Sequence, residues 1–197
     1  MPLMRLPAVA LAAASVMMAS APAHAAAVDP AVAKVEAFQD ALLASARQGG
    51  TQATRIRPLV VENFNIPVMA MFTVGPAWAA FSPGERMALV DAMTRYTAAR
   101  YAHEFNGGAP TRFVTQPIAQ VRGVDRLVKA EAFEPGEAPA KLFYRVREYG
   151  ASWKIIDVFY EGVSVLATQR ADFAPALASG GVPNLIRKLD EATARFR

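Results

Sequence analysis

Apolar side chains in the first half of the chain recur at intervals of three and four residues, which is the spacing of one face of an α-helix. The clearest case lies between residues 31 and 48, where charged residues occupy the opposite face and Gly49-Gly50 ends the pattern. Its apolar positions are Val32, Val35, Phe38, Leu42 and Leu43. The same spacing predicts a helix over residues 51–64 and a short, nearly all-apolar helix over 66–74.

A longer helix is predicted from Ser82 to about residue 106. Ser82-Pro83-Gly84-Glu85 matches a capping box, with a serine cap, proline at the first helical position and a glutamate placed to return to the cap amide. One row of side chains then follows at four-residue intervals: Leu89, Met93, Thr97, Tyr101 and Phe105. Asn106-Gly107-Gly108 is expected to end this helix.

After Gly108 the pattern changes to runs rich in β-branched and aromatic residues, separated by turn residues. They predict strands over residues 112–121, 127–133, 142–149 and 153–160, joined into an antiparallel sheet because the connections are short. Pro117 places the first run at an edge or a bulge. Two inward-facing sets fit the third run and its turn, either Leu142 with Tyr144 or Phe143 with Tyr149.

The chain returns to a helical pattern from about residue 167, breaks at Gly180-Gly181-Val182-Pro183, and resumes with Leu185, Ile186 and Leu189. Helices, then strands, then helices, without repeats or a low-complexity linker, predict a single α+β domain. We expect the helices to pack on one face of a twisted antiparallel sheet of four to five strands.

The first 25 residues have the pattern of a secretory signal peptide. Arg5 precedes an apolar run over residues 7–20, and Ala23-His24-Ala25 follows with the small residues that signal peptidase reads. The run is too short to span a bilayer, and no later stretch of about 18 apolar residues is found in the sequence. We therefore expect cleavage after Ala25, which leaves residues 26–197 as one exported domain.

Composition excludes several classes of protein. With 53% hydrophobic residues, 19% charged residues and no cysteine, the chain is not of the disordered, collagen-like or disulfide-scaffold type. Its formal net charge of +4 is a mild excess, so we expect no nucleic-acid partner.

The sequence gives little support for catalysis. Once His24 leaves with the signal peptide, His103 is the remaining histidine, and with no cysteine and no G-x-S-x-G motif the usual nucleophile and base pairs cannot be assembled. Ser164 fits a strand or turn residue better than a nucleophile. No Gly-rich loop joins a strand to a helix, and Asp125, Asp157 and Asp172 form no recognisable pair, so neither a cofactor nor a metal is expected.

Large, adaptable apolar side chains are concentrated in one stretch of the chain, at Met69, Met71, Phe72, Trp78, Met87 and Met93. One interpretation is an ordinary core. The other is a cavity between the helices and one face of the sheet that receives an apolar molecule.

Several short segments occur in the order that is typical of one protein family. The first are Phe64-Asn65-Ile66-Pro67-Val68-Met69-Ala70, Val74-Gly75-Pro76-Ala77-Trp78 and Ser82-Pro83-Gly84-Glu85-Arg86, followed by Arg95-Tyr96 to Tyr101 and Phe105-Asn106-Gly107. The later ones are Trp153-Lys154-Ile155-Ile156-Asp157-Val158, Glu161-Gly162-Val163-Ser164, Gln169-Arg170-Ala171-Asp172-Phe173 and Asn184-Leu185-Ile186 with Leu189. Together they resemble the MlaC family of periplasmic lipid-binding (toluene tolerance) proteins over most of the chain.

Within that family, Phe64-Asn65-Ile66-Pro67, Gly75-Pro76 and Gly180-Gly181 look closest to the branch associated with hopanoid biosynthesis, HpnM. The wider family more often has Asp at the position of Asn65 and Asn-Tyr-Arg at the position of Thr168-Gln169-Arg170. These departures bear on the cargo, for which a phospholipid and a hopanoid are the two alternatives, with a slight preference for phospholipid.

The resemblance implies a periplasmic α+β carrier that encloses lipid chains in an apolar cavity and shuttles them between outer-membrane and inner-membrane machinery. Its implied partners are an inner-membrane transporter and an outer-membrane lipoprotein complex, with transient membrane contact and a monomeric carrier. The candidate wall residues are Phe64, Met69, Phe72, Trp78, Met87, Met93, Tyr101, Phe133, Phe143, Tyr160 and Val163. Trp78 fits a plug beside the Gly75-Pro76 turn as well as it fits the wall.

Two other functions stay open. A small enzyme using the same cavity would need an acid–base group inside it, for which His103 is the candidate. An envelope interaction module without cargo would need the apolar residues to close into a solid core. Arg47, Arg55, Arg57 and Arg170 are candidates for contact with a lipid head group, although solvated charges are the more common role of such residues.

Overall fold

The computed structural model describes residues 28–48, 53–105 and 112–196. The predicted signal peptide, residues 1–25, lies outside these ranges, as do the predicted helix ends at Gly49-Gly50 and Asn106-Gly107-Gly108. Among the helices formed by the described residues, none is both long enough and apolar enough to cross a membrane.

The helices follow the predicted order closely. They are α1 (Pro30–Arg47), α2 (Ala53–Asn63), α3 (Ile66–Val74), the 3₁₀ helix η1 (Gly75–Ala80), α4 (Pro83–Glu104) and α5 (Val165–Ala194). The capping box at the start of α4 is confirmed, because the Ser82 hydroxyl accepts from the Glu85 amide and the Glu85 carboxylate accepts from the Ser82 amide. The predicted break in the last helix is confirmed by non-helical backbone at Gly180 and Gly181.

The sheet has six strands, whereas four to five were predicted. They are β1 (Arg112–Thr115), β2 (Gln120–Arg122), β3 (Asp125–Phe133), β4 (Ala140–Tyr149), β5 (Ser152–Tyr160) and β6 (Val163–Ser164). The predicted strand over residues 112–121 is divided into β1 and β2, both of which pair antiparallel with β3. Pro117 lies in the interruption, where its missing amide cannot join the ladder.

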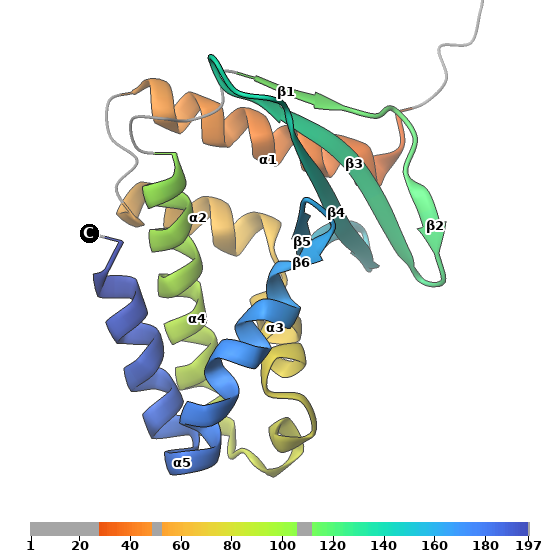
Figure 1. Ribbon diagram of the computed structural model, residues 1–197. Coiled ribbons are helices and arrows are strands. Elements are labelled where there is room, and N and C mark those ends of the chain that lie inside the picture. Colours follow the sequence, from red (N-terminus) through yellow and green to blue (C-terminus); the bar gives the residue numbers. More distant parts are fainter. Residues whose placement is uncertain (1–27, 49–52, 106–111, 197) are drawn as a thin grey trace, which may run out of the picture.

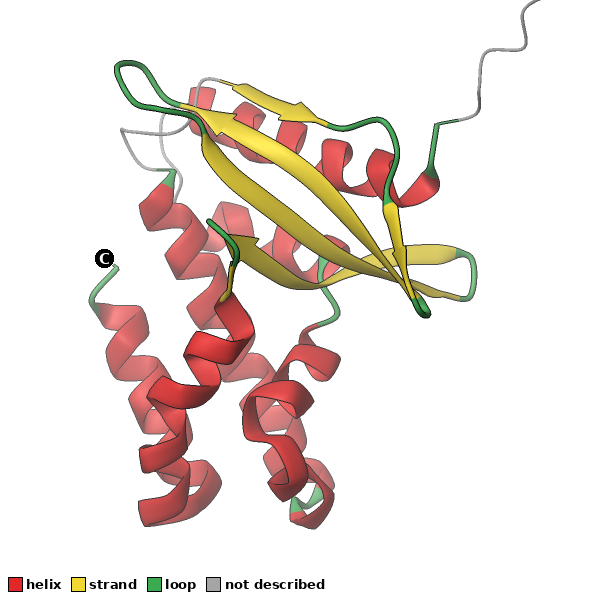
Figure 2. Ribbon diagram, turned by 45° about the vertical axis from the view of Figure 1, so that its right-hand side comes forward, coloured by secondary structure: helices red, strands yellow, loops and turns green. Residues whose placement is uncertain are grey.

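The helices gather on one side of this sheet. Figures 1 and 2 show α1 running along one sheet face, while α3, α4 and α5 extend away from the sheet as a helical lower part. The strand order β1-β3-β4-β5-β6 is antiparallel throughout, and the outer side of β5 is bridged by the corner between α2 and α3. There the Asn65 amide donates to the Ile155 carbonyl oxygen at 2.9 Å.

Alternation along the strands decides which side chains face the helices. Val128, Ala130 and Ala132 of β3 are buried, whereas their neighbours Lys129 and Glu131 lie on the opposite face. The same core contains fully buried side chains from every larger helix, among them Phe38, Ile56, Leu89, Met93 and Leu189. One core therefore joins the sheet to the helices.

An ion cluster holds one end of the β3–β4 hairpin. The Asp125 carboxylate accepts from Arg145 Nε at 2.6 Å and from Arg147 Nε at 2.5 Å, and its side chain is 1% exposed. Burial opposes its ionisation, but the hydrogen bonds from Arg147 and Arg145 outweigh this and lower the pKa of Asp125. The other end of the hairpin, at Ala132 and Ala140, borders the hollow described next.

Candidate functional site

A cavity of about 400 Å³ lies between α4, the start of α5 and the helix-facing side of the sheet. Its apolar walls come from seven elements and the corner that joins α2 to α3. They are Phe64, Met69, Tyr101, Phe105, Phe113, Ala132, Ala140, Leu142, Tyr144, Val158, Tyr160 and Val165. The volume lies within the range of about 300–1,000 Å³ that is usual for small-molecule sites.

Aromatic rings form the inner wall of the cavity. The Phe64 ring centroid lies 5.7 Å from that of Tyr101 in a tilted arrangement, and both rings pack edge-on against Phe38. Contacts continue from Tyr101 to Phe105 and from Phe105 to Phe113, each at 6.2 Å. Such packing fixes the rings and presents a broad apolar surface to the hollow.

Two of the three tyrosines in the lining, Tyr101 and Tyr144, keep their hydroxyls protonated at neutral pH. Burial raises the pKa of Tyr101 well above its usual value. Burial also raises the pKa of Tyr144 to about 12, although a hydrogen bond with the Gln39 side chain acts in the opposite direction. Neither phenol therefore adds a charge to the walls.

Two buried polar atoms of the lining have no hydrogen-bond partner among the described residues. They are Thr97 Oγ1 on α4 and Gln169 Oε1 on α5. Thr97 is 6% exposed and Gln169 is 5% exposed. An unpaired buried polar group costs about 1–3 kcal/mol, so each is available to a polar atom of a bound molecule.

Charged groups lie at one side of the cavity. Arg100 Nε donates to Glu104 Oε1 at 2.6 Å, and both residues contribute to the lining together with the exposed Glu134. Burial works against the charge of Arg100, but the neighbouring Glu104 carboxylate outweighs it and raises the pKa of Arg100. The remaining guanidinium nitrogens of Arg100 can still donate to an oxyanion.

Asp157 fastens the start of α5 to the sheet beside the cavity. Its carboxylate accepts from Ser164 Oγ at 2.7 Å, from the Val158 amide at 2.8 Å and from the Leu166 amide at 3.2 Å. Burial raises the pKa of Asp157, and these hydrogen bonds act in the opposite direction. Because its acceptor sites are used in capping α5, Asp157 has a structural role in this arrangement.

The geometry favours binding over acid–base chemistry. His103 is exposed on the last turn of α4, with its ring 5.4 Å from that of Phe196, and it does not contribute to the cavity lining. Across residues 28–48, 53–105 and 112–196, no group of three His, Asp or Glu side chains is placed to hold a metal ion. What the cavity offers is an apolar surface with a few polar groups at its edges.

Comparison with protein families agrees with this geometry. The family model described as MlaC protein matches residues 34–191, which is most of the chain. The chain belongs to the MlaC family.

A solved structure shares the MlaC-family fold seen here. It is the structure, in complex with a phospholipid, of a phospholipid-binding protein from Ralstonia solanacearum. That protein is 23% identical to this MlaC-family chain, with a TM-score of 0.71 over 85% of this chain and 99% of the other. Among curated proteins none matches.

Four of the eleven predicted wall residues line the cavity of this MlaC-family chain: Phe64, Met69, Tyr101 and Tyr160. The open choice between two strand faces is also answered, because Leu142 and Tyr144 face the cavity. Phe143 lies on the opposite face, where Lys129 Nζ is 5.9 Å from its ring. The register of β4 with β5 has a bulge at Arg145/Val146, which short-range alternation could not reveal.

Four predicted residues from the helices do not contribute to the lining. Met93 is fully buried in the core one turn before Thr97, and Met87 is 71% exposed in the first turns of α4. Phe72 is 38% exposed on α3. Trp78 belongs to η1, with its ring 6.2 Å from Phe81 and under the Arg86 guanidinium, which agrees with a plug and not with a wall.

Besides Phe143, two predicted strand residues lie away from the hollow. Phe133 points to the face opposite the buried Ala132, with the Arg112 guanidinium 3.7 Å from its ring. Val163 is 61% exposed at the first residue of β6. The sequence pattern showed only that both residues are apolar and lie in strands. Alternation along β3 directs Phe133 to the opposite face, and the position of Val163 at the end of a strand leaves it exposed.

The polar part of the lining was missed from the sequence. Thr97, Arg100, Glu104, Glu134 and Gln169 lie in the cavity lining, whereas the four predicted arginines do not. Arg47 and Arg55 are exposed, Arg57 pairs with Asp91, and Arg170 lies beside a second hollow. The available signal was the row that contains Thr97 and Tyr101, since Arg100 and Glu104 flank it on the same helical face.

Proposed function

We propose that this protein is a lipid carrier that takes at least one acyl chain into the cavity between α4, α5 and the sheet. The observation that carries the proposal is the cavity itself, about 400 Å³ in volume and walled by aromatic and aliphatic side chains. Membership of the MlaC family and the phospholipid in the structurally similar Ralstonia protein support it.

The physical demand on a carrier agrees with such a cavity. Exposing a lipid chain to water costs about 0.8 kcal/mol per methylene, so a naked chain cannot cross an aqueous space in quantity. A carrier must also release its cargo, which favours non-directional burial over a dense network of hydrogen bonds. The aromatic wall with two unpaired polar atoms, Thr97 Oγ1 and Gln169 Oε1, meets both requirements.

The carrier acts in the periplasm after cleavage of residues 1–25, as a single domain over residues 26–197 and as a monomer without a cofactor. Its partners are an inner-membrane transporter and an outer-membrane lipoprotein complex, and it contacts the membrane transiently. We expect it to move lipid between them and not to act as an enzyme, since His103 does not contribute to the cavity lining. The hollow also argues against a cargo-free interaction module, for which a solid core was required.

Phospholipid is the cargo that the lining favours over a hopanoid. A phosphate needs a hydrogen-bond donor in the lining, and Arg100 has further guanidinium N–H groups besides the Nε that binds Glu104. A rigid polycyclic lipid without a phosphate would lack the ionic part of this contact. The relation to the hopanoid-associated branch remains a prediction from Asn65, whose side chain caps α3 by accepting from the Val68 amide.

Transfer of a fluorescent phospholipid from vesicles to the full chain tests the proposal. Leu142→Trp fills the cavity, whereas the matched variant Phe143→Trp changes the opposite face of the same strand. We expect uptake by the parent chain and by Phe143→Trp, and strongly reduced uptake by Leu142→Trp. Equal uptake by both variants, or displacement of the phospholipid by a low concentration of hopanoid, would contradict the proposed site or cargo respectively.

A further inference from the structure

The outer edge of the sheet carries an unusual concentration of exposed aliphatic side chains. Among the described residues, six large hydrophobic side chains are 61–75% exposed. Four of the six lie along this edge, at or beside β2: Val28, Ile118, Val121 and Val124. We call these four residues the edge patch. Single exposed hydrophobic residues are common on protein surfaces, whereas a group of them is typical of a contact site.

Local contacts hold the edge patch together. The Asp29 carboxylate accepts from the Ala119 amide at 3.4 Å. This bond places the start of α1, where Val28 lies, beside the loop that carries Ile118. The other two members flank the short turn between β2 and β3.

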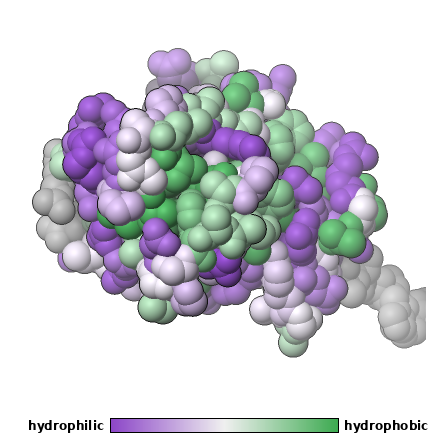
Figure 3. All heavy atoms as spheres, turned by 90° about the horizontal axis from the view of Figure 1, so that it is seen from below, coloured by the Kyte–Doolittle hydropathy of each residue, from purple (hydrophilic) through white to green (hydrophobic). Residues whose placement is uncertain are grey.

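The shape of this edge is a projecting tip and not a groove. Figures 1 and 2 show the turn between β2 and β3 at the margin of the molecule, away from α3, α4 and α5. Figure 3, a view from below, shows strongly hydrophobic atoms at the same side, bordered by hydrophilic ones. The edge patch lines neither the cavity nor a second hollow, which is an open groove of about 460 Å³ between α3, η1 and the first half of α5. The patch is therefore placed to enter an apolar environment outside the molecule.

The free edge of β2 is poorly suited to pairing with another chain. β2 has three residues, Gln120–Arg122, and Pro117 interrupts the pairing with β3 just before it. A partner strand needs a longer row of free amide and carbonyl groups, and a proline at an edge is a common obstacle to such pairing. A projecting aliphatic tip instead suits a deformable apolar medium, such as the interface of a lipid bilayer.

Positive charge surrounds the edge patch. Four arginines and three carboxylates lie at this end of the sheet: Arg122, Arg126, Arg145 and Arg147, with Asp29, Asp125 and Glu148. Asp125 is buried and already bound by two of the arginines, and Asp29 caps α1 by accepting from the Ala31 amide. This leaves Glu148 as the exposed acid of the group. A long arginine stem can follow an apolar surface while its guanidinium reaches a phosphate, so these side chains suit a layer of anionic head groups.

The opposite end of the β3–β4 hairpin has the reverse character. Residues 134–139 connect the two strands beside the cavity and carry Glu134 and Glu137 without a cation. Glu134 also lines the cavity. An anionic surface therefore attracts the end with the edge patch and repels the cavity end of the hairpin, which gives the molecule one preferred orientation.

We propose that the edge patch inserts into the interface of an anionic lipid bilayer, with its neighbouring arginines on the lipid phosphates and the cavity end of the hairpin turned away from the membrane. The inference rests on the proposed function, in which the carrier contacts a membrane transiently, and it assigns the surface that makes this contact. A few small aliphatic side chains give weak, reversible attachment, as a shuttle requires. The orientation leaves the cavity end free to meet a protein partner.

Sedimentation of the protein with vesicles tests the proposal. The vesicles are an equimolar mixture of phosphatidylglycerol and phosphatidylcholine, or phosphatidylcholine alone. Ile118→Asp and Val124→Asp place a carboxylate on the edge patch, and Met87→Asp is the matched control because Met87 is 71% exposed on α4, outside the patch. Every variant is expressed with the same N-terminal segment, so that segment cannot cause a difference between them.

We expect the parent chain and Met87→Asp to bind the anionic vesicles alike, and each patch variant to bind them about tenfold or more weakly. Arg122→Gln should weaken binding to the anionic vesicles about fivefold and leave binding to phosphatidylcholine unchanged. No binding by the parent chain would overturn the inference. So would equal losses in Met87→Asp and the patch variants, or patch variants that bind as the parent does.

A fluorescent label reports insertion without depending on the aspartate variants. The chain has no cysteine, so Val124→Cys and Met87→Cys each carry a single environment-sensitive dye. With anionic vesicles, the emission of the label at position 124 should shift to shorter wavelength and that of the label at position 87 should not; the reverse pattern would contradict the inference. Failure of phospholipid uptake into the cavity would contradict the proposed function and leave these measurements unchanged, so the two failures are distinguishable.

Discussion

Residues 182–194 of α5 pack tightly against α4, whereas residues 165–179 of the same helix border both hollows. In the later half, Val182 and Leu189 are 2% and 0% exposed, lie in the core and line neither hollow. In the earlier half, Gln169 and Phe173 are buried to a similar degree, yet one faces the cavity and the other the groove. Low exposure alone therefore does not distinguish a packed side chain from one that lines a hollow.

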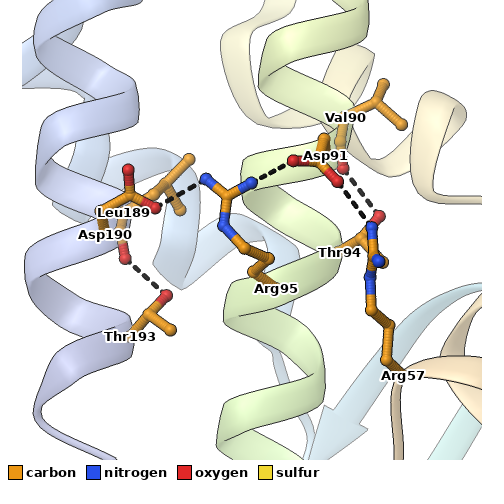
Figure 4. Close-up of polar contacts among 8 residues, drawn as sticks. All are labelled: Arg57, Val90, Asp91, Thr94, Arg95, Leu189, Asp190 and Thr193. Carbon is orange, nitrogen blue, oxygen red and sulfur yellow. Dashed lines mark hydrogen bonds and ion pairs between the residues drawn. The ribbon is translucent and has the colours of Figure 1, made fainter. Parts of the chain in front are cut away.

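The two halves of α5 also differ in their polar contacts. Figure 4 shows Arg95 of α4 between Asp91 and Asp190, at 2.7 Å from Asp190 Oδ1, while Arg57 of α2 binds Asp91 at 2.6 Å. These ion pairs connect α2, α4 and the later half of α5. The earlier half instead lines the two hollows and leaves Gln169 Oε1 without a hydrogen-bond partner among the described residues.

The largest expected contrast comes from the same substitution in each half. Leu189→Ala opens a cavity in a fully buried site and should lower the free energy of unfolding by about 3 kcal/mol. Leu177→Ala removes atoms from the wall of an existing groove and should cost about 1 kcal/mol. Urea unfolding measures both, and equal losses would show that the two halves are packed alike.

The break between the halves is the next target. Gly181→Ala places a side chain at a φ of 63° and should lower the free energy of unfolding by about 1–2 kcal/mol. Gly84→Ala is the control, because Gly84 lies in the first turn of α4 and a Cβ there meets no atom within 4 Å. It should be neutral or slightly stabilising. An unchanged free energy of unfolding in Gly181→Ala would contradict the requirement for glycine at this break in α5.

Replacing Gln169 tests whether its buried carbonyl oxygen lacks a hydrogen-bond partner. Gln169→Leu removes a buried oxygen without a partner and should raise the free energy of unfolding by about 1 kcal/mol. Gln39→Leu is a suitable comparison, since its Oε1 accepts from the Thr115 hydroxyl at 2.8 Å and its loss leaves that hydroxyl unpaired. We expect this second variant to be destabilised. Loss of stability in Gln169→Leu would mean that the oxygen has a partner after all.

The smallest expected effect is a dependence on pH at the start of α5. Because the folded pKa of Asp157 is raised by burial, the folded chain holds this proton more tightly than the unfolded chain does. Its contribution to stability therefore falls as pH rises from about 3.9, the unfolded value, through the folded pKa. We therefore expect the free energy of unfolding of Asp157→Asn, minus that of the parent chain, to rise as pH rises through this interval. Urea unfolding at a series of pH values measures this difference. A difference that falls with pH would reverse the assigned sign.

Most of the fold could be predicted because local interactions decide it. The start of α4 depends on Ser82 and Glu85, three residues apart, and the break in α5 falls at the predicted Gly180-Gly181. The number of strands was underestimated because strand pairing is not a local property. β1 and β2 are two short strands on one partner, and only their pairing with β3 reveals both.

The site was less predictable because it depends on how elements are rotated against one another. Met87 and Met93 lie on the same helix, yet one is exposed and the other is in the core. Arg100 reads as a surface charge in the sequence, and only the packing of α4 beside the sheet places it in the cavity lining. Leu142 and Phe143 are adjacent apolar residues whose opposite directions follow from the strand's orientation in the sheet.

Native mass spectrometry of the protein purified without detergent, after expression with its own N-terminal segment, tests the central claim most directly. The account predicts a bound lipid with the mass of a two-chain phospholipid on the parent chain and on Phe143→Trp, and its loss from folded Leu142→Trp. A folded parent chain that emerges without lipid and takes none from vesicles would contradict the account. So would the same lipid retained in full by Leu142→Trp.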